Sequence, residues 1–417
     1  MLFPALDLVR RYCRPMTSVF EAGLGGAVSP SLLADGECPW DRYARVDRSH
    51  WAGTMGPVVV ITDQAAARAV LADPRFHQGI RVTMENNPGI DPRFLARRLQ
   101  GLLLRDGPDH ARMRRLSTRA FTPRAADRHR PFMREVMHSL ADQVPADGVC
   151  DAVASLTQTY PIFVICRVLG APSQDVPMFS RVAETILNAQ SGAREYLEVG
   201  LAAHDELDAY VSDLIERRRS DPGPDLLSDL IAAEEDGGRL TREEMLHIVV
   251  SVIMAGTDTT RNQLALGLHL FADDPRQWEQ LTDGVRIERA VEEIIRFAPV
   301  GHVLSRVPDV DVEVHGVTIP AGTVVLMNIG ATNRGREIPD PDTFEPQRDP
   351  VPQHLTFGFG AKYCLGANLA RAELTEALSV LRSRFGSIEH AGVARFRQVG
   401  FIQGPMELPL RFGPTRG

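Results

Sequence analysis

The segment Phe357–Gly366 (Phe-Gly-Phe-Gly-Ala-Lys-Tyr-Cys-Leu-Gly) places one cysteine in a loop rich in glycine and aromatic residues. This cysteine, Cys364, is followed almost at once by Ala367–Leu381, an apolar run rich in helix-forming residues. The dipole and the open N–H groups at the start of a helix stabilise negative charge, so the position favours a thiolate. Gly358 and Gly360 are expected to turn the backbone tightly and to bring N–H groups close to the sulfur. The segment therefore predicts a fold that holds a charged sulfur at or near a helix N-terminus.

Other residues of the same loop suit the binding of a large, flat group. Phe357 and Phe359 are expected to keep water away from the sulfur, and Gly366 leaves room for a flat group against the loop. One thiolate in an apolar loop bent by glycines suits the axial ligation of a haem iron. The alternative is that Cys364 is a buried structural thiol.

The longest helical pattern covers Thr241–Phe271 and starts with a capping box, which Glu244 completes. Its apolar middle is interrupted at Met254–Thr260 (Met-Ala-Gly-Thr-Asp-Thr-Thr). A glycine and polar side chains in the apolar middle of a helix go against helix propensity and burial, and such departures tend to mark functional sites. Gly256 is expected to admit a flat ligand, and the Thr259 hydroxyl to bond back to a backbone carbonyl. The alternative is a helix with a polar patch that faces solvent.

Two further segments carry charge in a helical pattern. In the basic helix predicted over Arg105–Phe121, His110 and Arg114 lie four residues apart and share one face. Its other arginines are expected to form an exposed cationic face, with a docking patch for an acidic electron donor as the alternative; they are Arg112, Arg115 and Arg119. Glu293 and Arg296, at i and i+3 of a later helix, are interpreted as a structural pair.

Shorter patterns predict elements outside these helices. A strand is expected at Pro57–Ile61, with Asp63 capping the helix after it. His77–Pro92 is rich in glycine and asparagine and is expected to be a mobile loop. Alternation over Val310–Val314 predicts a half-buried strand, and Thr323–Asn328 a second one.

Composition restricts the class of protein. The chain has 417 residues, of which 44% are hydrophobic and 24% charged, as in ordinary globular proteins. This length suggests two or three domains or one large helical body. The formal charge of -8 argues against nucleic-acid binding, since phosphate contacts need a basic surface.

Five scattered cysteines without a CxxC pair predict reduced thiols. No run approaches the ~20 apolar residues of a membrane span, and the N-terminus is unlike a signal peptide. We therefore expect a cytoplasmic protein without a membrane anchor.

Taken together, these motifs closely resemble the signatures of soluble bacterial-type (class I) cytochromes P450. The haem-binding signature is matched by Phe357, Gly358, Gly360, Lys362, Cys364 and Gly366. Lys362 departs from the histidine or arginine usual at its position, and it would reach a propionate as a point charge. Ala255–Thr259 resembles the distal-helix motif, and Glu293 with Arg296 the Glu-x-x-Arg pair of the family.

The resemblance implies a mainly α fold with small β-sheets, built as a single P450 domain over residues 1–417 with an irregular stretch to about residue 50. It also implies a haem b cofactor with Cys364 as the iron ligand. Propionate contacts are expected from His110, Arg114, Arg306 and Lys362. Further contacts with the haem are expected from Phe357, Gly358, Ala255 and Gly366. Asp258 and Thr259 are expected to deliver protons to bound oxygen.

The activity that this resemblance implies is a monooxygenase reaction, in which one atom of O₂ is inserted into an apolar small molecule. The pocket is expected to be apolar because Met254, Val300, Val303 and Leu304 fall on its walls. The chain has no flavin or iron–sulfur motif, so a ferredoxin and its reductase are the expected electron donors. The alternatives are a P450 that uses peroxide, a haem-binding sensor or carrier without turnover, and a cofactor-free helical protein that binds a lipid.

Overall fold

The computed structural model describes residues 25–27, 43–85, 90–189, 194–235, 240–396 and 402–414. The chain forms two compact units. The first, the β-rich unit, draws on Met1–Pro88, Glu292–Cys364 and Arg395–Gly404. The second, the helical unit, draws on Gly89–Val291, Leu365–Ala394 and Pro405–Gly417. One domain over the whole chain stays a prediction. Most of the first fifty residues, expected to be irregular, lie outside the described residues, as do Cys13 and Cys38.

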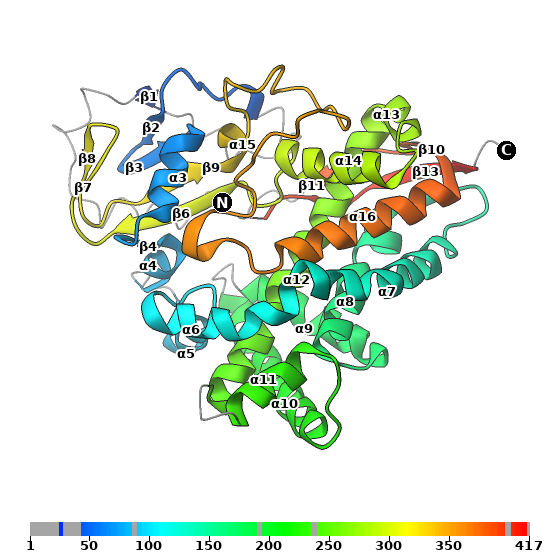
Figure 1. Cartoon of the computed structure of the whole chain (residues 1–417), viewed down its shortest axis with the longest axis horizontal. Helices are drawn as coiled ribbons and strands as arrows, with labels where there is room; N and C mark the ends of the chain where they lie inside the picture. The colour runs from blue at the N-terminus through cyan, green and yellow to red at the C-terminus, as the bar shows by residue number, and fades with distance from the viewer. Residues whose placement is uncertain are drawn as a thin grey trace. The chain divides into compact units, whose positions relative to one another are not determined.

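The β-rich unit contains a mixed six-stranded sheet (Figure 1). Its strands lie in the order β1 (Gly25–Ala27), β2 (Ala52–Met55), β3 (Val58–Ile61), β9 (Val325–Asn328), β6 (Val303–Pro308) and β4 (Phe76–Gln78). The pairs β1–β2 and β3–β9 are parallel, and the other neighbours are antiparallel. Every residue of β3 is buried, as is typical of a strand covered on both faces. The strands expected at β3 and β9 are therefore confirmed.

Helix α3 (Gln64–Ala72) packs Ala66, Ala67, Val70 and Leu71 into the core of this unit. Asp63 caps it as predicted, since its Oδ1 accepts from Ala66 N at 2.8 Å. The alternation predicted over Val310–Val314 is confirmed for Val312–Val314 only, because Val310 lies before the strand and is exposed. In β7 (Val312–Val314) the two valines are buried and Glu313 is exposed, and β7 pairs with β8 (Val317–Ile319). The shorter elements of this unit are α4 (Gly79–Glu85), α15 (Ile329–Thr332), η5 (Gly360–Lys362) and β11 (Arg395–Phe396).

The expectation of a loop over His77–Pro92 is wrong for most of its length. Strand β4 and helix α4 together cover Phe76–Glu85, and α5 begins at Pro92; residues 86–89 lie outside the described residues. The reason is a long-range pairing in which Gln78 faces Arg306 across the strands β4 and β6. Gly79 lies so close to β6 that an added Cβ would be 2.7 Å from the Ser305 side chain. Local composition does not show that such a partner strand exists.

The helical unit holds most of the helices. They are α5 (Pro92–Gln100), α6 (Gly107–Ser117), η2 (Thr118–Phe121), α7 (Pro123–Ala141), the π-turn η3 (Val153–Thr157), α8 (Tyr160–Leu169), η4 (Ser173–Asp175), α9 (Val176–Ala189), α10 (Arg194–Ser220), α11 (Leu226–Glu235), α12 (Arg242–Asp273), α13 (Pro275–Glu279) and α16 (Ala367–Arg384). Helix α14 (Gly284–Phe297) starts in this unit and ends in the β-rich unit. A three-stranded sheet of order β10 (Phe385–His390), β13 (Pro409–Pro414) and β5 (Val149–Asp151) completes the unit, with β12 (Pro405–Glu407) as a further strand.

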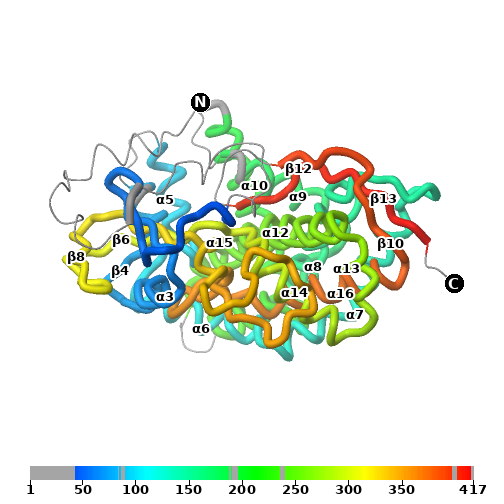
Figure 2. The backbone as a smooth tube through the Cα atoms, turned by 90° about the horizontal axis from the view of Figure 1, so that it is seen from above, coloured from blue at the N-terminus to red at the C-terminus, as the bar shows by residue number. Residues whose placement is uncertain are grey.

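Helix α12 is the central element of the helical unit. It packs against α8, α9, α10 and α16, and Figure 2 shows α8 and α9 beside it. Most of its residues are buried, which explains why its sequence is apolar on nearly every side. The mainly α fold with small β-sheets is confirmed. Within the described residues, no helix has the length and apolar character that crossing a membrane requires.

The predicted capping box at the start of α12 is confirmed. Thr241 Oγ1 accepts from Glu244 N at 3.1 Å, and Glu244 Oε2 accepts from Thr241 N at 3.0 Å. The same carboxylate accepts from both terminal nitrogens of Arg112, at 2.9 Å from Nη1 to Oε2. Hydrogen bonding from Arg112 lowers the pKa of Glu244 to about 2. Arg112 is thus paired rather than part of an exposed cationic face, so that interpretation is wrong for this residue.

This arrangement predicts a pH-dependent contribution to stability. Glu244→Gln should lower the free energy of unfolding at pH 7 by about 1 kcal/mol, because an ion pair and half of a capping box are weakened. The carboxylate pKa is depressed in the folded protein. Its contribution is therefore present above the ordinary pKa of 4.5 and is lost as the pH falls from there toward about 2. Urea unfolding at pH 7, 5 and 3 measures this difference.

The matched control is Glu243→Gln, which removes a carboxylate from the same first turn, where it is 81% exposed. We expect this variant to change stability by a few tenths of a kcal/mol at most. The stabilisation is assigned to the ionised carboxylate of Glu244. This assignment would be contradicted if Glu244→Gln and wild type differed in stability as much at pH 3 as at pH 7.

Candidate active site

The Cys364 loop is a tightly closed turn at the end of the β-rich unit. Gly358 and Gly360 adopt positive φ angles of 74° and 69°, so the predicted tight turns are confirmed. The loop closes through a hydrogen bond from Cys364 N to Phe357 O at 2.8 Å. The Cys364 side chain is exposed, and the cap of α16, Gly366, follows two residues later. The alternative of a buried structural thiol is therefore excluded.

The base of the loop is anchored to the core of the β-rich unit. Phe359 packs against that core and lies under the Arg68 guanidinium, whose central carbon is 5.1 Å from the ring centroid. A Cβ added at Gly360 would come within 2.9 Å of the carbonyl oxygen of Leu71, so only glycine fits there. Phe359 thus serves mainly to anchor the loop, whereas the backbone carbonyl of half-buried Phe357 accepts the hydrogen bond from Cys364 N that closes it.

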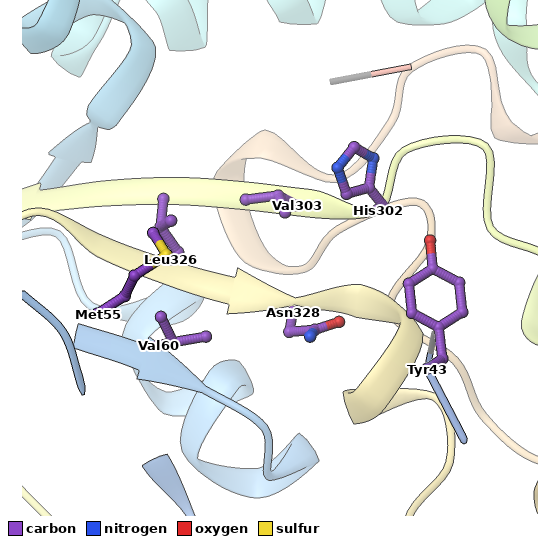
Figure 3. A pocket seen from close by; sticks show the side chains of 7 residues that line it. All are labelled: Tyr43, Met55, Val60, His302, Val303, Leu326 and Asn328. Atoms are coloured by element: carbon purple, nitrogen blue, oxygen red, sulfur yellow. The ribbon is translucent and has the colours of Figure 1, made fainter. Parts of the chain in front are cut away.

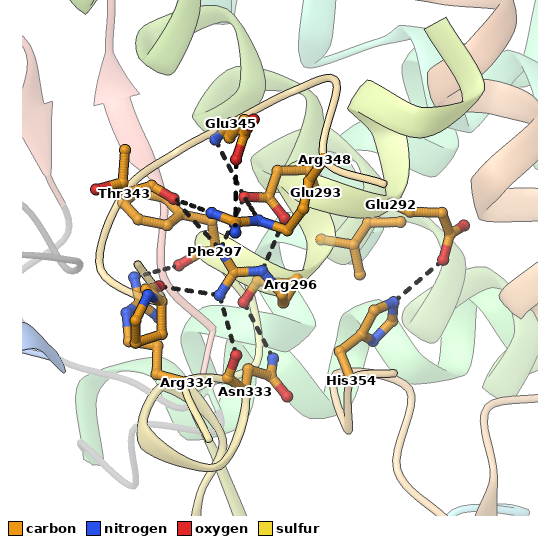
Figure 4. A network of polar contacts seen from close by, with 12 residues as sticks. Glu292, Glu293, Arg296, Phe297, Asn333, Arg334, Thr343, Glu345, Arg348 and His354 are labelled. Atoms are coloured by element: carbon orange, nitrogen blue, oxygen red, sulfur yellow. Dashed lines mark hydrogen bonds and ion pairs between the residues drawn. The ribbon is translucent and has the colours of Figure 1, made fainter. Parts of the chain in front are cut away.

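A buried ion-pair network lies in the same unit (Figure 4). Arg296 donates from Nε and Nη2 to the two oxygens of Glu293, both at 2.7 Å, and neither side chain is exposed. Arg348 Nε also donates to Glu293, at 3.2 Å, and its terminal nitrogens donate to three backbone carbonyls. The structural interpretation of Glu293 and Arg296 is confirmed, although they form a buried cluster rather than a surface pair.

The network continues by hydrogen bonds toward the Cys364 loop. Arg296 Nη1 donates to Asn333 O at 3.0 Å, and Asn333 Nδ2 returns a bond to Arg296 O at 3.1 Å. The Asn333 side chain also accepts from Leu355 N at 2.7 Å and donates to Thr356 Oγ1 at 2.9 Å. Gly358 N then donates to Leu355 O at 2.8 Å. The loop is therefore positioned by the buried charges.

His354 contacts Phe357 of the Cys364 loop, and the sequence did not indicate this contact. Its ring centroid lies 5.8 Å from that of Phe357, and its Nε2 is 3.3 Å from Glu292 Oε2. Its side chain is only 4% exposed. No local motif identifies it, because its partner Glu292 stands 62 residues earlier.

Arg306 is a buried guanidinium on strand β6. Its Nη1 donates to two neutral oxygens, Gln78 Oε1 at 2.6 Å and Ser305 O at 2.8 Å. A guanidinium offers N–H donors in a fork that matches the two oxygens of a carboxylate, so this side chain is suited to meet a carboxylate of a bound group. Lys362, on η5, is half-buried.

In the helical unit, His110 and Arg114 lie on α6 as predicted. His110 is buried and Arg114 is half-buried. Arg115 and Arg119 are exposed, which confirms the cationic face for these two residues.

The polar break in α12 presents two residues in different environments. Thr259 is half-exposed, and its hydroxyl donates to Ala255 O at 2.8 Å, so the predicted back-bond is confirmed. Ala255 itself is exposed, although it lies in the middle of a mostly buried helix. Asp258 is buried; its Oδ1 accepts from Asn262 Nδ2 at 3.0 Å and from Arg261 Nη2. Neighbouring residues of a helix point about 100° apart, so Asp258 and Thr259 do not share a face.

Gly256 has a different role from the one expected. A Cβ added there would lie 2.5 Å from Ile165 Cδ1 and 2.9 Å from Ile165 Cγ1 on α8. The missing side chain therefore allows α12 and α8 to pack closely. The expectation that Gly256 makes room for a flat ligand is wrong in this respect.

A small cavity lies on the sheet of the β-rich unit, with Val303 on its wall (Figure 3). It measures about 30 Å³ and is lined by Tyr43, Met55, Val60, His302, Val303, Leu326 and Asn328. A site for a drug-sized molecule needs roughly ten times that volume. This cavity is therefore too small for such a substrate.

Several features of these residues fit a haem group. The Cys364 thiol is exposed on a rigid loop, which suits a metal ligand. At Gly366 an added Cβ would meet no described atom within 4 Å, so open space lies beside the start of α16. Arg306 supplies a buried cation, and Ala255 and Thr259 leave part of α12 uncovered.

Comparison with known proteins gives consistent results. A family profile described as Cytochrome P450 matches residues 189–391. Mycinamicin IV hydroxylase/epoxidase from Micromonospora griseorubida is 39% identical over 361 residues, which cover 84% of this chain and 88% of that protein. Vitamin D(3) 25-hydroxylase from Pseudonocardia autotrophica is 33% identical over 366 residues, which cover 86% and 89%. This chain is also similar to a solved structure, that of P450BioI in complex with hexadec-9Z-enoic acid ligated acyl carrier protein. The TM-score is 0.81 and the sequence identity is 29%, and the match covers 90% of this chain and 98% of that one.

This chain belongs to the cytochrome P450 family. It is a P450 monooxygenase with a haem-iron cofactor, a small-molecule substrate and redox partners. The alternatives of a non-catalytic haem carrier and a cofactor-free lipid-binding protein are thereby set aside.

Within this P450, the predicted site residues fall into two groups. The β-rich unit holds Phe357, Gly358, Lys362 and Cys364 on one loop, and Arg306 on β6. The helical unit holds Ala255, Asp258 and Thr259 on α12, His110 and Arg114 on α6, and Gly366 at the start of α16.

The packing at Gly256 makes a prediction for stability. Gly256→Ala gains about 1 kcal/mol of helix propensity but crowds Ile165, and overpacking costs about 1–3 kcal/mol, so we expect a net loss of about 1 kcal/mol. In an Ile165→Ala background the clash is absent, and the same substitution should stabilise the protein. Urea unfolding of the two single variants and the double variant measures the coupling, expected to be about 1–2 kcal/mol. Additive effects would contradict this explanation.

Proposed function

We propose that this P450 uses Cys364 as the thiolate ligand of haem b and oxidises an apolar small molecule with O₂ and electrons from a ferredoxin and its reductase. The observation that carries the proposal is the exposed cysteine on a glycine loop that closes by a hydrogen bond from Cys364 N to Phe357 O. Haem iron with a thiolate ligand supplies the chemistry of O–O cleavage and oxygen insertion. The protein side chains bind and orient this group and control proton access.

Cations and small residues would hold the haem. Arg306, with His110, Arg114 and Lys362, would meet the propionates, because each offers a cationic or hydrogen-bonding group that is buried or half-buried. The apolar or small residues Phe357, Gly358, Ala255 and Gly366 would line its faces. A Cβ at Gly358 would make only ordinary contact with Leu304 Cδ1, at 3.7 Å, so its φ of 74° rather than crowding favours glycine there.

Protons would be delivered by α12. The Thr259 hydroxyl donates to Ala255 O, so its lone pairs are oriented to accept a hydrogen bond from a water molecule near the helix. The Asp258 carboxylate, held by Arg261 and Asn262, would exchange protons along a chain of water molecules with this site. A back-bonded hydroxyl keeps one orientation, which favours directed transfer to oxygen over random protonation.

The electron donor would dock on the exposed arginines of α6 and η2. Arg115 and Arg119 are exposed on a chain whose formal charge is -8, so a local basic surface would orient an acidic ferredoxin. Arg112 contributes little to this surface because Glu244 and Asp109 neutralise it. Location in the cytoplasm remains a prediction, as does the dependence on a ferredoxin rather than on peroxide.

The substrate would be largely hydrocarbon. Relatives are named for mycinamicin IV and vitamin D3, and solved neighbours are titled with testosterone and myristic acid. The side chains expected on the pocket walls are apolar as well: Met254, Val300, Val303 and Leu304. Burial of such surfaces would supply most of the binding energy.

Cys364→Ser tests the central assignment. The reduced wild-type protein with carbon monoxide should show the Soret absorption band at the unusually long wavelength that is typical of thiolate ligation. The Cys364→Ser variant should lose this band completely. Cys150→Ser is the matched control, since Cys150 is a half-buried thiol on β5 in the other unit, and this variant should keep the band. A normal band in the Cys364→Ser variant would disprove the assignment.

Thr259→Ala tests proton delivery. The variant should bind haem and substrate normally, but product per NAD(P)H should fall and hydrogen peroxide should rise, because loss of a positioned hydroxyl slows productive proton transfer by about 10²-fold and the unproductive release of peroxide then competes. Both quantities are measured with ferredoxin and reductase present. The control is Thr257→Ala, which removes the same back-bonded hydroxyl (to Ile253 O, 3.1 Å) from a buried position of α12. Equal coupling in the two variants would exclude the proposed role of Thr259.

A further inference from the structure

Two histidines and one aspartate meet at the C-terminal end of α12. His269 and Asp273 lie four residues apart in its last turn, and His390 is the last residue of strand β10. Helix and strand pack against each other within the helical unit, and Figure 1 shows β10 beside α13, the helix that follows α12. Among the described residues, this is the one group of three such side chains whose ligand atoms all lie within 4.8 Å of one another.

The three ligand atoms form a compact triangle. His390 Nε2 is 2.7 Å from Asp273 Oδ1, His269 Nδ1 is 3.2 Å from His390 Nε2, and His269 Nδ1 is 3.5 Å from Asp273 Oδ1. In a tetrahedral zinc site with bonds of about 2.0–2.1 Å, ligand atoms lie about 3.3 Å apart. The triangle therefore has nearly the size of one face of such a tetrahedron, without any movement of the backbone.

Hydrogen bonds can join at most two of the three pairs of ligand atoms at the same time. If His390 Nε2 carries a proton, it donates to Asp273 at 2.7 Å and cannot accept from His269. If it carries no proton, it faces the carboxylate with a lone pair. In either state one of the close contacts lacks a well-placed proton. A cation at the centre of the triangle would satisfy the lone pairs of all three atoms at once.

The surroundings also suit a cation. The carbonyl end of a helix carries partial negative charge, and Asp273 is the last residue of α12. The side chains become more exposed from His269 (7%) to His390 (29%) and Asp273 (43%), so solvent reaches one side of the triangle. Two imidazoles with one carboxylate suit borderline-soft divalent metals, and the solvent side leaves a position for water.

We propose that His269, Asp273 and His390 bind one divalent transition-metal ion, Zn²⁺ in particular, with water completing the coordination. The ion would link the last turn of α12 to the end of β10, two segments that are 117 residues apart in sequence at Asp273 and His390. Because the unfolded chain does not hold these residues together, binding would stabilise the folded enzyme. The site lies outside the residues proposed to hold haem and does not depend on the proposed function.

The test uses the full-length, haem-loaded enzyme after treatment with a chelator and dialysis. Zinc chloride is titrated by calorimetry, and bound zinc is counted after equilibrium dialysis. We expect one zinc per chain and a rise in the unfolding temperature of about 3 °C at a free zinc concentration about 100 times Kd. Magnesium chloride, a cation that prefers oxygen ligands, should give no such rise.

Asp273→Asn and His390→Gln each remove one ligand while preserving approximate shape, and each should weaken zinc binding by about 100-fold or more. His138→Gln is the control, because His138 is exposed in the last turn of α7 and belongs to no such group among the described residues. It should bind zinc like wild type. Unchanged stoichiometry and Kd in both ligand variants, or no zinc on wild type, would overturn the proposal.

X-ray absorption at the zinc edge on the wild-type enzyme supplies a result that needs no variant. We expect two imidazole nitrogens and two oxygens around the metal. A sulfur ligand or a single imidazole would place the zinc elsewhere, for instance at a cysteine, and would overturn the assignment even if the variants fail to fold.

Discussion

The shape of the cysteine loop depends on a charge cluster that is buried far from water. Glu293 accepts hydrogen bonds from Arg296 and Arg348, so two guanidinium groups share one carboxylate in the interior. Backbone carbonyls of the segment Asn333–Thr343 accept further guanidinium protons, and this segment therefore cannot move without leaving buried N–H groups without these acceptors. Loss of one partner from such a cluster costs about 3–5 kcal/mol, much more than loss of a surface pair. Through Asn333, the same restraint reaches Leu355 and Thr356, directly before the turn that carries Cys364.

Helix α12 meets a different requirement, because it must be both a packing core and a polar surface. Most of its length is buried against four other helices, and close packing at Gly256 against Ile165 leaves no room for a side chain. At the same level the helix exposes Ala255 and partly exposes Thr259. Asp258 is compatible with the buried side only because Arg261 and Asn262 of the same helix satisfy its carboxylate. Two consecutive residues of the helix, which point about 100° apart, thus carry a charged, buried group and a neutral, accessible hydroxyl.

Features that depend on neighbouring residues in sequence were predictable, whereas features that depend on distant partners were not. The glycine turns of the cysteine loop, the capping box at Thr241, the back-bond of Thr259 and the alternation of β7 all follow from local chemistry, and the structure confirms them. The strand β4 and the pairing of Arg112 with Glu244 depend on segments far along the chain, and local composition misled the interpretation of both. His354 and the triad at the end of α12 were missed for the same reason. His269 and Asp273 have a helical spacing, but no pattern indicates that His390 lies beside them.

The two chemical regions of α12 are separated by enough helix to act independently. His269 follows Thr259 by ten positions, which corresponds to about 15 Å along the axis at 1.5 Å per residue. A metal at the last turn would therefore not touch the hydroxyl or the groups around it. Substitutions at sites this far apart with no shared partner generally have additive effects on stability. It follows that the metal would change how firmly the end of the helix is held against β10, while proton delivery would depend on the middle of the helix alone. A change in coupling efficiency on removal of zinc would therefore mean that α12 transmits strain along its axis from its last turn to Thr259.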